Sequence, residues 1–279
     1  MTYKTIVAIM PDLSVAGRVF AAAAPIARKF GSHVIAVHAE PSAAAYATPI
    51  GFPEAGVLEM NIEESRKRAE DLKEKVNEMA RVEAISFEWR SMESFIGDSA
   101  VSGINSAHCA DLVIAGQPDP DNTTSIANDV EALIFDSGRP VLFVPYAANI
   151  PTEFKRVLVA WNGTREAARA TFDAMPFLHA AEKVEIFTVD PESGSDQSAA
   201  TAGAEIATVL ARHGVNVTTE TQISDGIKPA SIIENRLADT QADLLVMGAY
   251  SHSRIMERLF GGVTRTVMKS MPTLTLMSR

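Results

Sequence analysis

The chain has 279 residues, of which 47% are hydrophobic and 22% charged, a balance that is ordinary for a folded protein. Its formal charge of −10 argues against a general attraction to nucleic acid or anionic membranes, because that attraction needs clustered Lys and Arg. The single cysteine, Cys109, excludes an intrachain disulfide and a thiolate metal site, and we expect it to be a small buried side chain. Neither a membrane segment nor a signal peptide is recognised, so we expect a cytoplasmic protein.

Strands and helices are predicted to alternate in two series. The first has strands at 4–10, 33–39, 83–89, 111–116 and 140–144, with helices near 14–30, 61–80, 97–109 and 126–137. The second has strands at 155–161, 183–189, 215–222, 243–248 and 273–277, with helices near 164–180, 197–213, 228–240 and 262–270. Such alternation predicts parallel sheets with helices on both faces. The expected fold class is α/β, as two doubly wound five-stranded sandwiches in tandem.

The two series are copies of one unit. The segment Ala-Asp-Leu-Val-Ile-Ala-Gly at 110–116 reappears at 242–248 as Ala-Asp-Leu-Leu-Val-Met-Gly, an offset of 132. The first strands correspond at an offset of 151, so the first copy holds 19 additional residues. We place them in a long loop at 42–60, which is either functional or an inert surface insertion, and which could bind another small molecule or a lipid. The domains are expected at 1–147 and 153–279.

The loop after the fourth strand of the second copy has the composition of a phosphate site. Gly261 and Gly262 stand at the start of the next helix, where unpaired amides and the helix dipole favour an anion. Thr264 adds a hydroxyl on the first turn, and Ser253 and Arg254 could supply further donors. We therefore expect an anionic ligand in this copy.

This loop resembles that of ATP-binding universal stress proteins, which carry the pattern Gly-x2-Gly-x9-Gly-Ser/Thr at this place. The spacing matches at Gly248, Ser251 and Gly261, and the following Val263-Thr264 is also similar. Ser251 replaces the second glycine, and Gly262 replaces the Ser/Thr, which removes one phosphate contact. The resemblance covers nearly the whole chain, as two domains in series. It implies the adenine nucleotide alpha hydrolase-like fold with strand order 3-2-1-4-5.

The resemblance also implies the ligand, an adenine nucleotide (ATP, ADP or AMP), with Mg²⁺ as an accompanying ion. The acidic residue that the family places near the ribose corresponds to Asn162, and Asp12 stands about one residue away from that place in the first copy, although each could equally be a helix cap. The backbone at Val189 would meet the adenine edge. The expected ligand contacts are Asn162, Val189, Gly248, Ser251, Ser253, Arg254, Gly261, Gly262, Val263 and Thr264.

The corresponding loop of the first copy begins at Gly116 and has lost the glycine pair. Its Asp119 and Asp121 would repel phosphate, and they lack the glycine and glutamate of a calcium loop, so we expect no phosphate site there. Standard catalytic and metal motifs are not recognised. Of the six histidines only His252, in the second-copy loop, is a candidate for a ligand contact, and most of the others are expected at helix ends or on the surface.

Two functions are compatible with these features. The first is a universal stress response protein whose second copy holds an adenine nucleotide as a regulatory module, with at most weak ATP hydrolysis and no catalytic residue that can be named. The alternative is a scaffold or chaperone-like stress protein that binds no nucleotide and acts through its surfaces. The resemblance further implies pairing through the last strands, either within the chain as a pseudo-dimer or between two chains as a homodimer. We expect the protein to bind neither nucleic acid nor membranes, and we expect no side chains that coordinate a metal ion.

Overall fold

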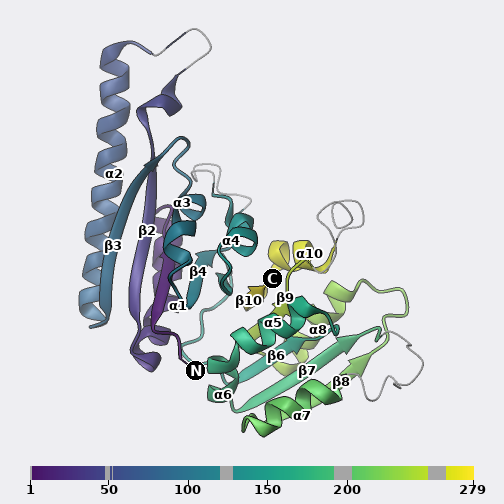
Figure 1. The fold of residues 1–279 in the computed structure, drawn as a ribbon. Helices are drawn as coiled ribbons and strands as arrows, with labels where there is room; N and C mark the ends of the chain where they lie inside the picture. Colours follow the sequence, from purple (N-terminus) through teal and green to yellow (C-terminus); the bar gives the residue numbers. More distant parts are fainter. Residues whose placement is uncertain (1, 48–50, 52, 120–127, 192–202, 251–261) are drawn as a thin grey trace. The chain divides into compact units, whose positions relative to one another are not determined.

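The computed structural model describes residues 2–47, 51, 53–119, 128–191, 203–250 and 262–279. They form two compact units, Tyr3–Arg139 and Pro140–Arg279. Each unit has a mostly parallel sheet with helices packed on it (Figure 1). The predicted α/β fold class is therefore confirmed.

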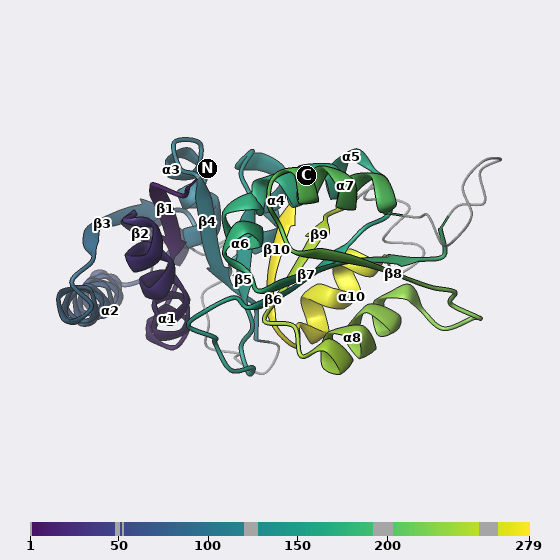
Figure 2. The ribbon, with the colours of Figure 1, turned by 90° about the horizontal axis from the view of Figure 1, so that it is seen from below.

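The unit of residues 3–139 has four parallel strands in the order β3-β2-β1-β4. The strands are β1 (Thr5–Ile9), β2 (His33–Pro41), β3 (Ser86–Ser94) and β4 (Leu112–Gly116). The helices are α1 (Leu13–Phe30), the short 3-10 helix η1 (Ala43–Tyr46), α2 (Ala55–Val82), α3 (Ser99–Ala107) and α4 (Val130–Asp136). Helices α1 and α2 pack together on one face of the sheet, and α3 and α4 pack together on the other (Figure 2).

The unit of residues 140–279 has six strands in the order β5-β10-β9-β6-β7-β8. The strands are β5 (Val141–Val144), β6 (Arg156–Ala160), β7 (Lys183–Val189), β8 (Val217–Gln222), β9 (Leu244–Gly248) and β10 (Leu274–Ser278). The helices are α5 (Arg165–Asp173), α6 (Met175–Ala180) and α7 (Ala204–Arg212) on one face, with α8 (Pro229–Thr240) and α10 (Val263–Ser270) on the other (Figure 2). Strands β8-β7-β6-β9-β10 reproduce the expected order 3-2-1-4-5. The last strand of the first copy, β5, runs antiparallel beside β10.

Several element boundaries differ from those predicted. Helix α2 begins at Ala55 rather than near residue 61, so the segment 42–60 contains η1 and the first turns of a helix as well as loop. Strand β3 continues to Ser94 because it pairs with β2 along its whole length. The predicted helix 164–180 is divided into α5 and α6, since Pro176 starts a new helix. Cys109 is exposed, so the expectation that it is buried was wrong.

The cores of both units come from strands that are buried on both sides. Residues Leu244–Met247 of β9 are buried, as are Leu112–Ala115 of β4, which the continuous apolar sequence predicts for parallel strands. In the part of the chain that the structure describes, no helix is both long enough and apolar enough to cross a membrane.

A glycine ends the fourth strand of each copy because the first helix approaches that strand closely. A Cβ atom on Gly116 would lie 2.5 Å from Val15 Cγ1 of α1. A Cβ atom on Gly248 would lie 2.4 Å from Ala167 N and 2.5 Å from Glu166 C, both backbone atoms at the start of α5. These glycines therefore have a packing role whether or not a ligand binds.

We predict that Gly248→Ala lowers the free energy of unfolding by about 1–3 kcal/mol, because the helix backbone at Ala167 cannot rotate away from the new methyl group. Gly17→Ala is the matched control, since nothing lies within 4 Å of a Cβ atom on that helical glycine. It should raise stability by up to about 1 kcal/mol through helix propensity. Urea unfolding midpoints measure both changes, and an unchanged midpoint for Gly248→Ala would refute the packing role.

Candidate functional site

The predicted ligand residues that the structure describes lie at one edge of the sheet. Val189, Asn162 and Gly248 stand at or just beyond the carboxyl ends of the adjacent strands β7, β6 and β9. The start of α10 is held against this edge, because Tyr250 N donates a hydrogen bond of 3.1 Å to Thr264 Oγ1. Gly262 and Val263 begin that helix. Ligand sites of open parallel sheets occur at such an edge, where the strand order reverses.

Four of the predicted contacts, Ser251, Ser253, Arg254 and Gly261, lie in the segment 251–261, outside the described residues. His252 lies in the same segment. The described ends of this segment are Tyr250, which has a positive φ of 54°, and Gly262. Of the two described residues that flank the segment 251–261, Tyr250 has the left-handed backbone conformation, which is strained for a bulky residue.

The start of α10 offers backbone donors to an anion. Gly262 is its N-cap residue and has no side chain to accept from the first-turn amides, and no acidic residue lies in that turn. Thr264, the next residue but one, is 3% exposed, and its hydroxyl accepts from Tyr250 N. A helix start without a capping side chain leaves amide groups and the positive end of the dipole available.

Asn162 and Asp12 act on the first helix of their units. Asp12 is the N-cap of α1, and its Oδ1 accepts from Ser14 N at 2.8 Å and Val15 N at 3.0 Å, which confirms the capping interpretation for this residue. The cap of α5 is Thr164, and Asn162 Oδ1 accepts from the Thr164 hydroxyl at 2.7 Å. Asn162 thus orients the capping residue and is exposed at the strand end.

Three buried polar groups at this edge were missed by the sequence analysis. Thr188 Oγ1 and Ser278 Oγ are buried and find no hydrogen-bond partner in the described part of the chain. Glu166, at the start of α5, is 3% exposed and pairs with Arg165 at 2.5 Å. Burial acts to raise the pKa of Glu166, but the hydrogen bond from Arg165, a backbone hydrogen bond and the charges of Arg165 and Arg279 together hold the pKa below its ordinary value. Unpaired buried hydroxyls are costly, so they favour a polar ligand here.

The corresponding place in the unit of residues 3–139 is filled by a network of charged side chains. The register pairs Thr5↔His33 and Arg156↔Lys183 make His38 the counterpart of Thr188. His38 is 2% exposed and stacks on Trp89 of β3 at 5.7 Å between ring centroids. The two copies therefore differ in chemistry at the same position of the second strand.

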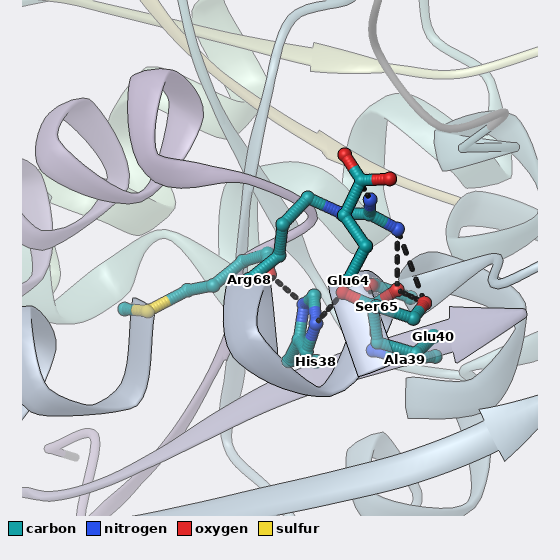
Figure 3. A network of polar contacts seen from close by, with 8 residues as sticks. His38, Ala39, Glu40, Glu64, Ser65 and Arg68 are labelled. Atoms are coloured by element: carbon teal, nitrogen blue, oxygen red, sulfur yellow. Dashed lines mark hydrogen bonds and ion pairs between the residues drawn. The ribbon is translucent and has the colours of Figure 1, made fainter. Parts of the chain in front are cut away.

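The network joins β2 to α2, as Figure 3 shows. His38 Nδ1 lies 2.9 Å from the Met10 carbonyl oxygen, and Nε2 lies 3.1 Å from Glu40 Oε1. The other oxygen of Glu40 accepts from the Ser65 hydroxyl and, at 3.3 Å, from Arg68 Nη2. Burial acts to raise the pKa of Glu40, but hydrogen bonds from His38 and Ser65 and the charge of Arg68 hold it below its ordinary value. The Met10 carbonyl oxygen and a Glu40 carboxylate oxygen both accept hydrogen bonds, so each ring nitrogen of His38 faces an acceptor.

No group of three or more metal-ligating side chains is found among the described residues. The edge of the unit of residues 140–279 thus offers backbone amides, hydroxyls and the Asn162 amide to a ligand. These groups fit an adenine nucleotide, whose phosphates accept hydrogen bonds and whose base and ribose both donate and accept them.

Residues 153–279 match the family model described as the Universal stress protein family. A universal stress protein from Archaeoglobus fulgidus DSM 4304 has a similar fold, with a TM-score of 0.71, 18% identity, and coverage of 98% of this chain and 96% of that chain. A functionally unknown protein from Pseudomonas aeruginosa PAO1 matches with a TM-score of 0.60, 18% identity, and coverage of 99% and 92%. At these identities the likeness shows the fold alone. No curated protein matches the chain.

We predict that Glu40→Gln lowers the free energy of unfolding at pH 7 by about 1–3 kcal/mol, because it leaves buried His38 without its carboxylate. A carboxylate whose pKa is lowered on folding stabilises the fold at pH values above its pKa in the unfolded chain. This stabilisation is lost as the pH falls through its pKa in the folded protein. The difference from wild type should therefore shrink below pH 4.5, the ordinary pKa of Glu40.

The difference in stability between the variant and wild type is measured by thermal unfolding from about pH 3 to about pH 7, because carboxylates titrate in the lower part of this range. Glu64→Gln is the matched control, because Glu64 lies 3.7 Å from the same Arg68 but is 68% exposed. It should cost less than about 1 kcal/mol. A Glu40→Gln deficit of the same size at every pH would show that ionisation of Glu40 is not what stabilises the network.

Proposed function

We propose that the chain is a tandem universal stress response protein whose unit of residues 140–279 binds an adenine nucleotide and acts as a regulatory module. The observation that carries the proposal is the start of α10, where no side chain caps the first-turn amides beside the side-chain-free end of β9 at Gly248. The match of residues 153–279 to the Universal stress protein family supports it. We propose that residues 3–139 derive from the same kind of domain.

In this proposal the phosphates lie at the amides of Val263 and the residues that follow it, next to Gly262. Asn162 lies near the ribose and the backbone of Val189 near the base, with the Thr188 hydroxyl as a nearby polar group. Ser251, Ser253, Arg254 and Gly261 are proposed as further phosphate contacts from the loop. Thr264 acts indirectly, because its hydroxyl holds Tyr250 and so fixes the two ends of that loop together. Mg²⁺, where a triphosphate is bound, is proposed to be held by the phosphates.

The difference between the two units supports a single nucleotide site. In residues 3–139 the His38–Glu40 pair, with Ser65 and Arg68, satisfies the polar groups at the end of β2. In residues 140–279 the hydroxyl of the counterpart Thr188 finds no hydrogen-bond partner among the residues that the structure describes. At the end of the second strand a nucleotide would therefore meet an unpaired hydroxyl in residues 140–279 only, whereas elsewhere in residues 3–139 Asp12 Oδ2 and Ser94 Oγ are buried without a partner among the described residues. The nucleotide-bound and nucleotide-free forms of the protein would then differ, which is what a regulatory module requires. No catalytic residue is proposed.

We predict that ATP, ADP or AMP at millimolar concentration raises the melting temperature, since a ligand at 100 times its Kd adds about 2.7 kcal/mol to stability. Gly262→Asp should abolish this rise, because its carboxylate caps α10 and repels phosphate. The same variant should be slightly more stable than wild type without nucleotide, by about 0.3 kcal/mol, since Asp is a better N-cap than Gly.

Lys228→Asp is the matched control. Lys228 is the N-cap residue of α8 and also has no side-chain cap, so the substitution adds the same carboxylate at the start of a different helix, which packs beside α10 on the same face of the sheet. It should keep the response to nucleotide. No melting shift of the wild-type protein with any of the three nucleotides would leave the scaffold function as the better account.

A further inference from the structure

A cavity of about 440 Å³ lies at the amino ends of β6 and β7, beside the end of α8. This is the opposite edge of the sheet from Gly248 and Gly262, because all these strands are parallel. A volume of this size suits a small molecule. The cavity is lined by Arg156, Val157, Leu158, Lys183, Glu185, Arg236, Asp239, Thr240 and Ala242.

Two of its cations lie side by side. Arg156 and Lys183 are register partners on neighbouring parallel strands, so their side chains leave the same face of the sheet. No ion pair is found for either side chain with any residue that the structure describes, and both residues are exposed. The adjacent Lys155 differs, since its Nζ pairs with Glu153 and Glu182 at 3.5 Å each. Like charges at paired positions repel, and an anion between them would remove the repulsion.

A third cation is fixed in the wall of the cavity. Arg236 Nε lies 2.7 Å from Glu185 Oε1 and Nη2 lies 2.9 Å from Oε2, and the guanidinium lies over the ring of Phe187. The Glu185 side chain is 7% exposed. The Arg236 side chain is 27% exposed, so the pair is partly buried, and removing charges from water in this way costs desolvation that apolar residues of similar size avoid. Its presence here therefore calls for a reason other than stability.

The other unit shows that the fold does not require these charges. At the offsets that relate the two copies, Arg156 and Lys183 correspond to Thr5 and His33, which are also register partners. Glu185 and Arg236 correspond to Ile35 and Ile104. Two apolar residues thus occupy the places of the partly buried ion pair in the other unit.

We propose that this cavity binds a small molecule that carries an oxyanion, either phosphate or carboxylate, between Arg156 and Lys183. Arg236 forms the polar wall behind the anion, and Asp239 at the end of α8 accepts hydrogen bonds from donors on the rest of the ligand. The site is separate from the proposed nucleotide site. It does not depend on whether that site binds a nucleotide.

Titration with sodium phosphate and with sodium acetate at constant ionic strength tests the proposal, using amide chemical shifts of Val157 and Ala242 as a local readout. The full chain is used as wild type and with Gly262→Asp, which blocks the start of α10. Saturable shifts with either anion in both proteins are expected, and the anion that acts identifies the group. Shifts that grow without saturation, or that vanish with Gly262→Asp, would overturn the proposal.

Arg156→Gln and Lys183→Gln should each raise the half-saturating anion concentration by about tenfold, whereas the control Lys155→Gln should change it less than about twofold. Without anion, the first two variants should melt no lower than wild type because the repulsion is relieved, and Lys155→Gln should not gain stability. Equal effects of all three substitutions on the titration would contradict the proposal.

Discussion

One carboxylate in each unit fixes the strand pair on which the candidate site depends. Asp111 Oδ2 accepts from the backbone amides of Lys4 and Thr5 at 2.7 and 2.9 Å. Asp243 Oδ2 accepts from Lys155 and Arg156, both at 2.8 Å. The contact sets the start of the first strand beside the start of the fourth, and these are the neighbours at which the strand order reverses. This register also places the carboxyl ends of the two strands side by side, and the candidate ligand site lies at those ends.

At that edge the two units have a similar backbone arrangement but different polar side chains. Gly116 and Gly248 both let the first helix approach the end of the fourth strand, against the Val15 side chain in one unit and against the helix backbone in the other. Beyond this point, the His38–Glu40 network ties α2 to β2 in one unit, whereas the other retains the unpaired Thr188 hydroxyl and an uncapped α10. The backbone fold is thus common to both units, while a few side chains decide which polar groups the crevice offers to a ligand.

The sequence predicts the strand order and the edge because both depend on periodicity and repeat spacing, which are local. It does not predict the His38 network, because Ser65 and Arg68 reach Glu40 from a helix 25 and 28 residues further along the chain, and periodicity within each element does not say which side chains meet across elements. Nor does it distinguish Thr264 as a phosphate contact from Thr264 as the acceptor for Tyr250, since composition is the same in both cases. Tertiary partners decide these roles.

The two proposed ligand sites lie at opposite ends of the same strands. Strand β6 has five residues from Arg156 to Ala160, so about 15 Å or more separates the cations at its start from the edge at its end. The Debye length at physiological ionic strength is about 8 Å, so direct electrostatic influence between the two sites is largely screened. A protein with a net charge of −10 can therefore hold one anion by backbone amides and another by paired cations, with neither requiring a basic surface overall.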